Sequence, residues 1–104
     1  MKTFTEDQTR IKLIDPLLKE VGFHLNKEKD REYEVSGMPN EKGIGFVDYV
    51  LWGDDGLPLA VVEAKKDSEH PTKGLQQAID YAKKLHVRFV YSSNGKQTYE
   101  FDLD

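Results

Sequence analysis

Three charged residues near the middle of the chain could do chemistry together. Asp48 lies within one apolar segment, and the next apolar segment ends in Glu63-Ala64-Lys65. Two carboxylates can hold one divalent cation, and a neighbouring lysine can orient a water molecule and stabilise developing negative charge. Together, these groups are the minimum set for metal-assisted hydrolysis of a phosphodiester bond.

A β-hairpin would bring these three residues together. If residues 53–56 form a four-residue loop, Trp52 pairs with Leu57 and Asp48 faces Val61 across an antiparallel ladder. Side chains alternate between the faces of a sheet with a period of two, so the three charged residues would share one face. The two carboxylates would then be diagonal neighbours, roughly 7–8 Å apart.

Each of these charged groups also has a simpler interpretation. Glu63 and Lys65 would be ordinary charges at a fraying strand end, and Asp48 would be a turn or edge carboxylate. However, residues 59–62 are apolar on both faces, which is typical of a strand covered on both sides. Asp48 also has apolar neighbours, and its unpaired burial there would be costly. These features favour the metal-site interpretation.

Length, charge and composition limit the remaining possibilities. The 104 residues suffice for one domain over 1–104 and leave no room for a second core. A net charge of −4 argues against tight nucleic-acid binding by this chain alone, although not against a nuclease that has a partner domain. The lack of cysteine fits a reducing, cytoplasmic location. Neither a signal peptide nor an apolar run of spanning length occurs, so we expect a soluble chain without membrane contact.

The hydrophobic pattern predicts an α/β fold with a mixed sheet. Thr5 and Gln8 have the spacing of a helix capping box, and Asp15-Pro16 favours a kink or a fresh helix start rather than a loop. A strand–helix–strand crossover implies helices on both faces of the sheet. The expected elements are a helix over 5–22, a polar loop over 26–32, a strand over 33–36, a hairpin over 46–66, a helix over 72–86, and strands over 87–92 and 98–103.

Further short motifs accompany the three charged residues. The first helix contains Thr5-Glu6, Thr9-Arg10 and Leu13-Ile14-Asp15-Pro16, and Gln77 and Tyr81 lie four residues apart in the second. In order and spacing these motifs resemble the N-terminal nuclease domain of the motor (restriction) subunit of type I restriction-modification enzymes. That family is a branch of the PD-(D/E)XK restriction-endonuclease-like superfamily. Val47 stands where the superfamily name has proline, which has no chemical role.

The resemblance implies a restriction-endonuclease-like core and Mg²⁺-dependent endonucleolytic cleavage of DNA, the activity of a type I site-specific deoxyribonuclease. Asp48, Glu63 and the backbone carbonyl of Ala64 would hold Mg²⁺, for which Mn²⁺ can substitute. Lys65 would act on the attacking water. Three kinds of accessory role also follow: a metal-water contact for Glu6, a phosphate contact for Arg10, and DNA contact or support of the catalytic residues for Gln77 and Tyr81.

The accessory residues have structural alternatives too. Glu6 would be a favourable acid at a helix N-terminus, and Arg10 would form an i,i+4 pair with it. Gln77 and Tyr81 share one helical face at the edge of the apolar stripe, where they could merely flank the core.

The same resemblance implies partners and a larger protein. They are double-stranded DNA, the modification and specificity subunits, and a translocase region of the same subunit that uses ATP and is absent from this chain. The chain would then be a fragment of a longer restriction subunit, and the isolated fragment could be inactive. Two alternatives stay open: a non-catalytic nuclease-like module for docking or DNA binding, and a repair-type nuclease of the same superfamily.

Overall fold

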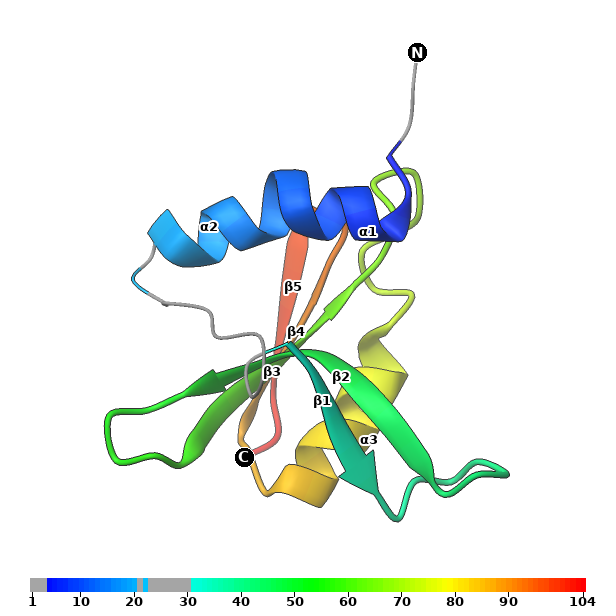
Figure 1. The fold of residues 1–104 in the computed structure, drawn as a ribbon, viewed down its shortest axis with the longest axis vertical. Helices are drawn as coiled ribbons and strands as arrows, with labels where there is room; N and C mark the ends of the chain where they lie inside the picture. Colours follow the sequence, from blue (N-terminus) through cyan, green and yellow to red (C-terminus); the bar gives the residue numbers. More distant parts are fainter. Residues whose placement is uncertain (1–3, 21, 23–30) are drawn as a thin grey trace.

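The computed structural model describes residues 4–20, 22 and 31–104. Five strands form one mixed sheet in the order β1-β2-β3-β4-β5, and only β3 and β4 run parallel (Figure 1). The helix α3 connects these two parallel strands. The elements are α1 (Glu6–Thr9), the π-helical segment η1 (Arg10–Ile14), α2 (Asp15–Glu20), β1 (Arg31–Ser36), β2 (Ile44–Trp52), β3 (Pro58–Ala64), α3 (Leu75–Leu85), β4 (Phe89–Ser93) and β5 (Thr98–Asp102).

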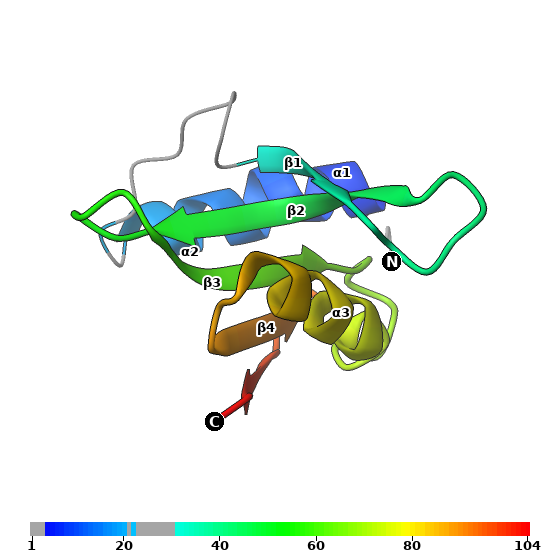
Figure 2. The same ribbon diagram turned by 90° about the horizontal axis from the view of Figure 1, so that it is seen from below.

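The sheet has helices on both faces. Figure 2 shows α3 on one side and the N-terminal helical segment on the other. On the α3 side, Ala78 and Tyr81 pack in a cluster with Val50 and Val61. On the other side, Ile14 and Leu18 belong to a second cluster. The predicted α/β class, with a mixed sheet and a helix on each face, is therefore confirmed.

The N-terminal helical segment follows its sequence signals closely. The Thr5 hydroxyl accepts from the backbone N–H of Gln8, and the Gln8 side chain accepts from the N–H of Thr5, so the capping box is complete. A π-helical turn precedes Asp15, where α2 begins. Asp15, at the junction, has helical dihedral angles (φ −54°, ψ −49°), and its N–H donates to the carbonyl of Arg10, so the helix continues from η1 into α2. No loop interrupts the helix at Asp15-Pro16, as the sequence predicts, and the irregularity there takes the form of a π-helical turn.

Several predicted boundaries shift. Arg31 and Glu32 lie in β1 rather than in a loop, and residues 26–30 fall outside the described part of the chain. The second helix begins at Leu75 instead of residue 72 and ends at Leu85, because His86 adopts a left-handed conformation that closes it. Strand β4 covers 89–93 rather than 87–92.

The hairpin register also differs from the prediction. Trp52 pairs with Pro58, not with Leu57, and a bulge follows between Leu51 and Trp52. The ladder then continues to Tyr49, which pairs with Val62. The prediction that Asp48 faces Val61 is therefore wrong by two residues. Because two residues are one full side-chain period, the shift preserves the faces of the strand.

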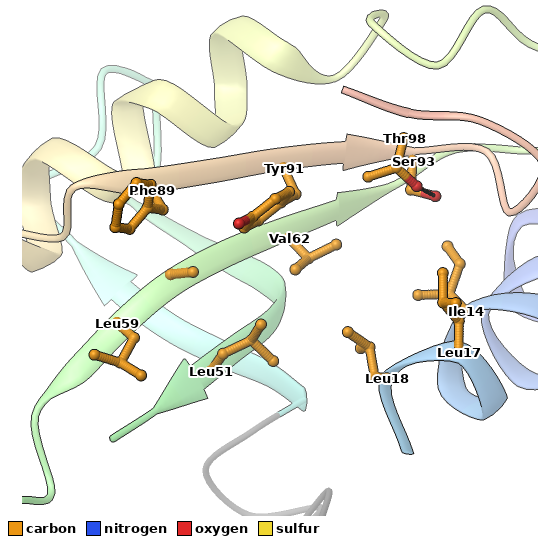
Figure 3. Close-up of a pocket in the computed structure, with 11 residues that line it drawn as sticks. Ile14, Leu17, Leu18, Leu51, Leu59, Val62, Phe89, Tyr91, Ser93 and Thr98 are labelled. Atoms are coloured by element: carbon orange, nitrogen blue, oxygen red, sulfur yellow. Dashed lines mark hydrogen bonds between the residues drawn. The ribbon is translucent and has the colours of Figure 1, made fainter. Parts of the chain in front are cut away.

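An apolar cavity of about 440 Å³ lies between the N-terminal helical segment and the sheet. Figure 3 shows Ile14, Leu17 and Leu18 across from side chains of β2, β3 and β4. The described residues that line it include no carboxylate, lysine, arginine or histidine. This cavity therefore lacks the groups needed for hydrolysis, and the candidate site lies elsewhere.

Candidate active site

Asp48 and Glu63 meet where the β2–β3 ladder ends. The last pair of this ladder is Tyr49 with Val62, so Asp48 and Glu63 are the first residues beyond it on the two strands. The Asp48 backbone N–H donates to Glu63 Oε1 over 3.2 Å, and Asp48 Oδ2 accepts from the N–H of Ala64 over 2.8 Å. Both side chains are thus held by neighbouring backbone, and Glu63 is only 4% exposed.

The site favours a proton on its carboxylates. Burial and the nearby charge of Asp48 raise the pKa of Glu63 to about 9. Burial also raises the pKa of Asp48, although the N–H of Ala64 opposes this shift. Glu63 is buried and Asp48 is partly buried, and two such carboxyl groups this close cannot both ionise easily unless a cation lies beside them. The pair is therefore short of positive charge.

Lys65 brings a cation to the same place. Its backbone N–H donates to the carbonyl of Ser93 over 2.8 Å, which extends the β3–β4 pairing by one residue. The Lys65 charge lowers the pKa values of Glu6, Asp48 and Glu63, each against the larger effect of burial. The three residues singled out in the sequence are therefore close in space.

Arg10 supplies a second cation, from η1. Its guanidinium lies 3.3 Å from Asp48 Oδ1, 2.6 Å from Asp7 Oδ1 and 3.3 Å from Glu32 Oε1. Burial and the charge of Asp48 raise the pKa of Glu6, whereas Arg10 and Lys65 lower it. Arg10 thus contacts the candidate site itself, and within the helix it pairs with Asp7, at i,i+3.

A buried aspartate fixes the helix that carries Glu6 and Arg10. Asp67, in the loop after β3, accepts from the Phe4 backbone N–H over 3.0 Å, and its own N–H donates to the Thr9 hydroxyl over 3.2 Å. Lys96 Nζ lies 3.6 Å from the Asp67 carboxylate, whose side chain is 6% exposed. These bonds tie the start of the helix to the end of β3, beside the carboxylate pair.

A polar cavity of about 390 Å³ adjoins the site at Asp48, and Glu63 and Lys65 are not among the described residues that line it. It is open to solvent and lined by four acidic residues, one arginine and one aromatic side chain. Such a surface attracts cations and repels phosphate unless a cation intervenes. The lining residues are Glu6, Asp7, Arg10, Glu32, Phe46 and Asp48.

Gln77 and Tyr81 occupy different environments. Gln77 is exposed, as expected for the edge of the stripe, but Tyr81 is 2% exposed and belongs to the core cluster on the α3 side. The prediction that Tyr81 lies at the edge is therefore wrong. Its hydroxyl accepts from Gln77 Nε2 over 3.3 Å. Burial raises the pKa of Tyr81, and the charge of Glu63 raises it further. A hydrogen bond with the Phe46 backbone lowers it. The hydroxyl thus approaches β2 two residues before Asp48.

The residues present suit a cation that needs few protein ligands. Within the described ranges, no group of three or more His, Cys, Asp or Glu side chains is arranged to hold a metal ion. Mg²⁺, however, usually keeps several waters and takes only one or two carboxylates. The buried Asp48–Glu63 pair, short of positive charge, fits this requirement. For Ala64 the structure gives the N–H bond to Asp48, and a carbonyl contact remains a prediction.

Some residues of the site were not found from sequence. Glu32 and Asp7 both bind Arg10, and Phe46 lines the cavity. A longer first strand would have revealed Glu32, because the β1–β2 register places it between the pairs Arg31–Tyr49 and Tyr33–Val47, across from Asp48. No sequence pattern marked Asp7 or Phe46.

Comparison with known proteins identifies the family. Residues 5–104 match the family described as type I restriction enzyme R protein N terminus (HSDR_N). The chain belongs to this family. This R-protein N-terminal region is 50% identical over 70 residues to the type I restriction enzyme EcoAI endonuclease subunit of Escherichia coli. The match covers 66% of this chain and 9% of that protein.

A solved structure supports the same assignment. It is a fragment assigned as the HsdR subunit of a type I restriction enzyme from Vibrio vulnificus YJ016, with a TM-score of 0.81 and 32% sequence identity. The match covers 99% of this R-protein region and 22% of that chain. The region is thus a small part of both relatives. Among the described residues, no helix is long and apolar enough to cross a membrane.

Proposed function

We propose that this R-protein region is a single nuclease domain that carries Mg²⁺-dependent endonucleolytic cleavage of DNA phosphodiester bonds. The main observation that supports this proposal is that Asp48, Glu63 and Lys65 come together at the open end of the β2–β3 ladder. Membership of a restriction-enzyme family supports DNA as the substrate. The arrangement also favours a restriction-endonuclease-like core of the PD-(D/E)XK class.

In this proposal Asp48, Glu63 and the Ala64 carbonyl hold Mg²⁺, with Mn²⁺ as a substitute. The bound ion supplies polarisation of the scissile phosphate and activation of a water molecule. Lys65 donates hydrogen bonds to that water and stabilises negative charge on the phosphate oxygens. The Ala64 N–H holds Asp48 in the orientation needed for binding, because it fixes one carboxylate oxygen.

The accessory residues divide into two groups. Glu6 and Arg10 reach the site from the first helix, where Glu6 suits a contact with metal-bound water and Arg10 a contact with phosphate. Tyr81, with Gln77 beside it, supports the backbone at Phe46 from inside the core. For Tyr81 we therefore propose support of Asp48 rather than direct contact with DNA.

Partners follow from the acidic surface and from the size of the relatives. An acid-lined site and a net charge of −4 give little phosphate affinity. DNA must then be held by other parts: the ATP-driven translocase region of the same subunit, and the modification and specificity subunits. With DNA as substrate and no cysteine in the chain, a cytoplasmic location is favoured.

The test uses an R subunit that carries this region, assembled with its partner subunits. Asp48→Ala, Glu63→Ala and Lys65→Ala should each abolish DNA cleavage and leave ATP-dependent translocation intact. No Gly-x-x-x-x-Gly-Lys loop for nucleotide phosphates occurs in the 104 residues, so the motor should not depend on them.

Glu41→Ala is the matched control, because Glu41 is an exposed acid in the β1–β2 turn. It should cleave at the wild-type rate. Wild-type cleavage by any of the three site variants would instead support a nuclease-like module that only docks or binds DNA.

A further inference from the structure

Gly74 lies at a position whose backbone does not require glycine. It is the N-cap of α3, buried, with φ −92° and ψ 3°. These dihedral angles are open to other residues. Serine, threonine, aspartate and asparagine are preferred at N-caps because their side chains accept a helix N–H, yet α3 has no side-chain cap. The glycine therefore needs another explanation.

The space beside Gly74 provides that explanation. A Cβ atom at this position would lie 2.8 Å from Lys65 Cε, and 3.4 Å from both Glu63 Cβ and Ser92 Oγ. The Lys65 side chain thus passes directly over the Gly74 Cα, one bond before its ammonium group. The Lys65 charge acts on Glu6, Asp48 and Glu63, so this path leads to the carboxylates.

We propose that Gly74 is a positioning residue, which keeps the Lys65 ammonium beside Asp48 and Glu63 because it leaves the path of that side chain free. The inference rests on the nuclease function proposed above and deepens it. Gly74 contacts neither substrate nor metal in this role and acts only through Lys65.

A side chain at position 74 should disturb the position of Lys65 more than the stability of the fold. The closest atom to a new Cβ is near the end of a flexible side chain, which can move aside at little cost to the fold. To restore a carbon–carbon contact of about 3.5–4.0 Å, Lys65 Cε must retreat by roughly 1 Å. A displacement of this size at a reacting group can lower the rate by about 100-fold. Gly74→Ala should therefore fold well and cleave poorly.

Gly45 shows the opposite behaviour. A Cβ there would lie 2.5 Å from the Tyr81 hydroxyl oxygen and 2.9 Å from its ring carbon Cε1. The Tyr81 ring is rigid and buried, so it cannot retreat as a lysine can. Gly45→Ala should lower the thermal midpoint, unlike Gly74→Ala. Of the two glycines, only Gly74 can be replaced so that a charged group moves while the fold stays stable.

The experiment compares Gly74→Ala and Gly74→Ser with Gly53→Ala as the matched control. Gly53 has no left-handed φ, and its added Cβ would meet two flexible side chains, those of Asp55 in the β2–β3 turn and Leu59 in β3. Serine adds an N-cap acceptor, so Gly74→Ser keeps the fold if alanine weakens it. Cleavage is measured in the assembled R subunit, and thermal midpoint and Mg²⁺ affinity are measured on the 104-residue chain.

We expect both Gly74 variants to cleave about 100-fold more slowly, with Mg²⁺ affinities no lower than wild type and with Gly53→Ala unchanged. The thermal midpoint of Gly74→Ser should be no lower than that of the wild type. In NMR spectra, the wild type should show a contact between the Gly74 α-protons and the Lys65 ε-protons. The Lys65 ε-methylene shift should change in both Gly74 variants and not in Gly53→Ala.

The outcomes separate the two proposals. If Lys65→Ala cleaves like wild type, the nuclease proposal fails and the role of Gly74 fails with it. If Lys65→Ala is inactive but both Gly74 variants cleave within twofold of wild type, only the Gly74 inference is overturned. Loss of cleavage with an unchanged Lys65 ε-methylene shift overturns it as well, because Gly74 would then act by another route.

Discussion

Binding of Mg²⁺ at the Asp48–Glu63 pair should release a proton. Burial and the charge of Asp48 raise the pKa of Glu63 to about 9, so the metal-free pair carries close to one proton at neutral pH. A carboxylate must lose its proton to bind a cation. Because the two groups interact strongly, the released proton belongs to the pair rather than to Glu63 alone.

The magnitude follows from that pKa. Below about pH 9 each unit of pH should change the apparent Mg²⁺ affinity about tenfold, because one proton competes with one cation. Between pH 6.5 and 8.5 the affinity should therefore rise about 100-fold, and it should level off above pH 9. The absolute affinity is expected to be modest, since a two-carboxylate site retains several waters.

Titration calorimetry in buffers with different ionisation enthalpies counts the released protons directly. The wild type should release about one proton per Mg²⁺ at pH 7. Glu63→Gln should release almost none and bind weakly, whereas Glu41→Gln, at an exposed turn, should match the wild type. If the wild type binds Mg²⁺ with an affinity independent of pH over this range, the buried pair is not the binding site.

Three further predictions concern the surroundings of the site. Tyr81→Phe should cost about 1–2 kcal/mol of unfolding free energy in urea titrations, because the hydroxyl is buried and bonded, whereas exposed Gln77→Ala should stay within about 0.5 kcal/mol; equal small effects would contradict this environment for Tyr81. Arg10→Met should strengthen Mg²⁺ binding roughly twofold to fivefold by calorimetry, since it removes a competing ion pair of about 0.5–1 kcal/mol at Asp48; weaker binding would mean that Arg10 supports the metal-binding geometry. In chelator, the unfolding free energy of the wild type should fall as pH rises from about 4.5 to about 9, because folded Glu63 holds its proton more tightly than unfolded Glu63; Glu63→Gln should flatten this slope, and an unchanged slope would assign it to other groups.

The meeting of Asp48 and Glu63 at one end of the hairpin could be predicted, but the register could not. The actual pairing is shifted by two residues from the predicted one. The turn itself is longer than expected. Gly53 N–H donates to the Leu57 carbonyl, and the Asp55 carboxylate accepts from the Leu57 N–H. A side-chain bond of this kind lengthens the loop, and composition alone does not show it.

The environment of Tyr81 depended on a distant residue. A helical wheel places Tyr81 at the edge of the stripe, but it cannot include what the helix packs against. In the structure, Gly45 of β2 has no side chain and leaves room for the Tyr81 ring, which fills that space and becomes buried. Long-range complementarity between a glycine and an aromatic ring has no local sequence signal.

The site exists because β2 does not alternate regularly at Asp48. Val47 and Val50 both pack in the cluster on the α3 side, although residues three apart on a regular strand would face opposite sides. Across the β1–β2 ladder, Glu32 has a left-handed φ of 51°, which is rare for a non-glycine residue and costs energy. Strain of this kind persists only where the surroundings fix it, and the Arg10 contact to Glu32 is one such restraint.

The irregularity has a direct consequence for Asp48. Pairing with β3 ends at Tyr49, and the first half of β2 separates from the end of β3 (Figure 1). The Asp48 carboxylate enters this opening and accepts the N–H of Ala64, while its own N–H binds Glu63. On a regular strand, backbone carbonyls would accept such N–H groups and the carboxylates would point away from the sheet. A break in the ladder thus turns two ordinary strand residues into a buried pair that needs a cation.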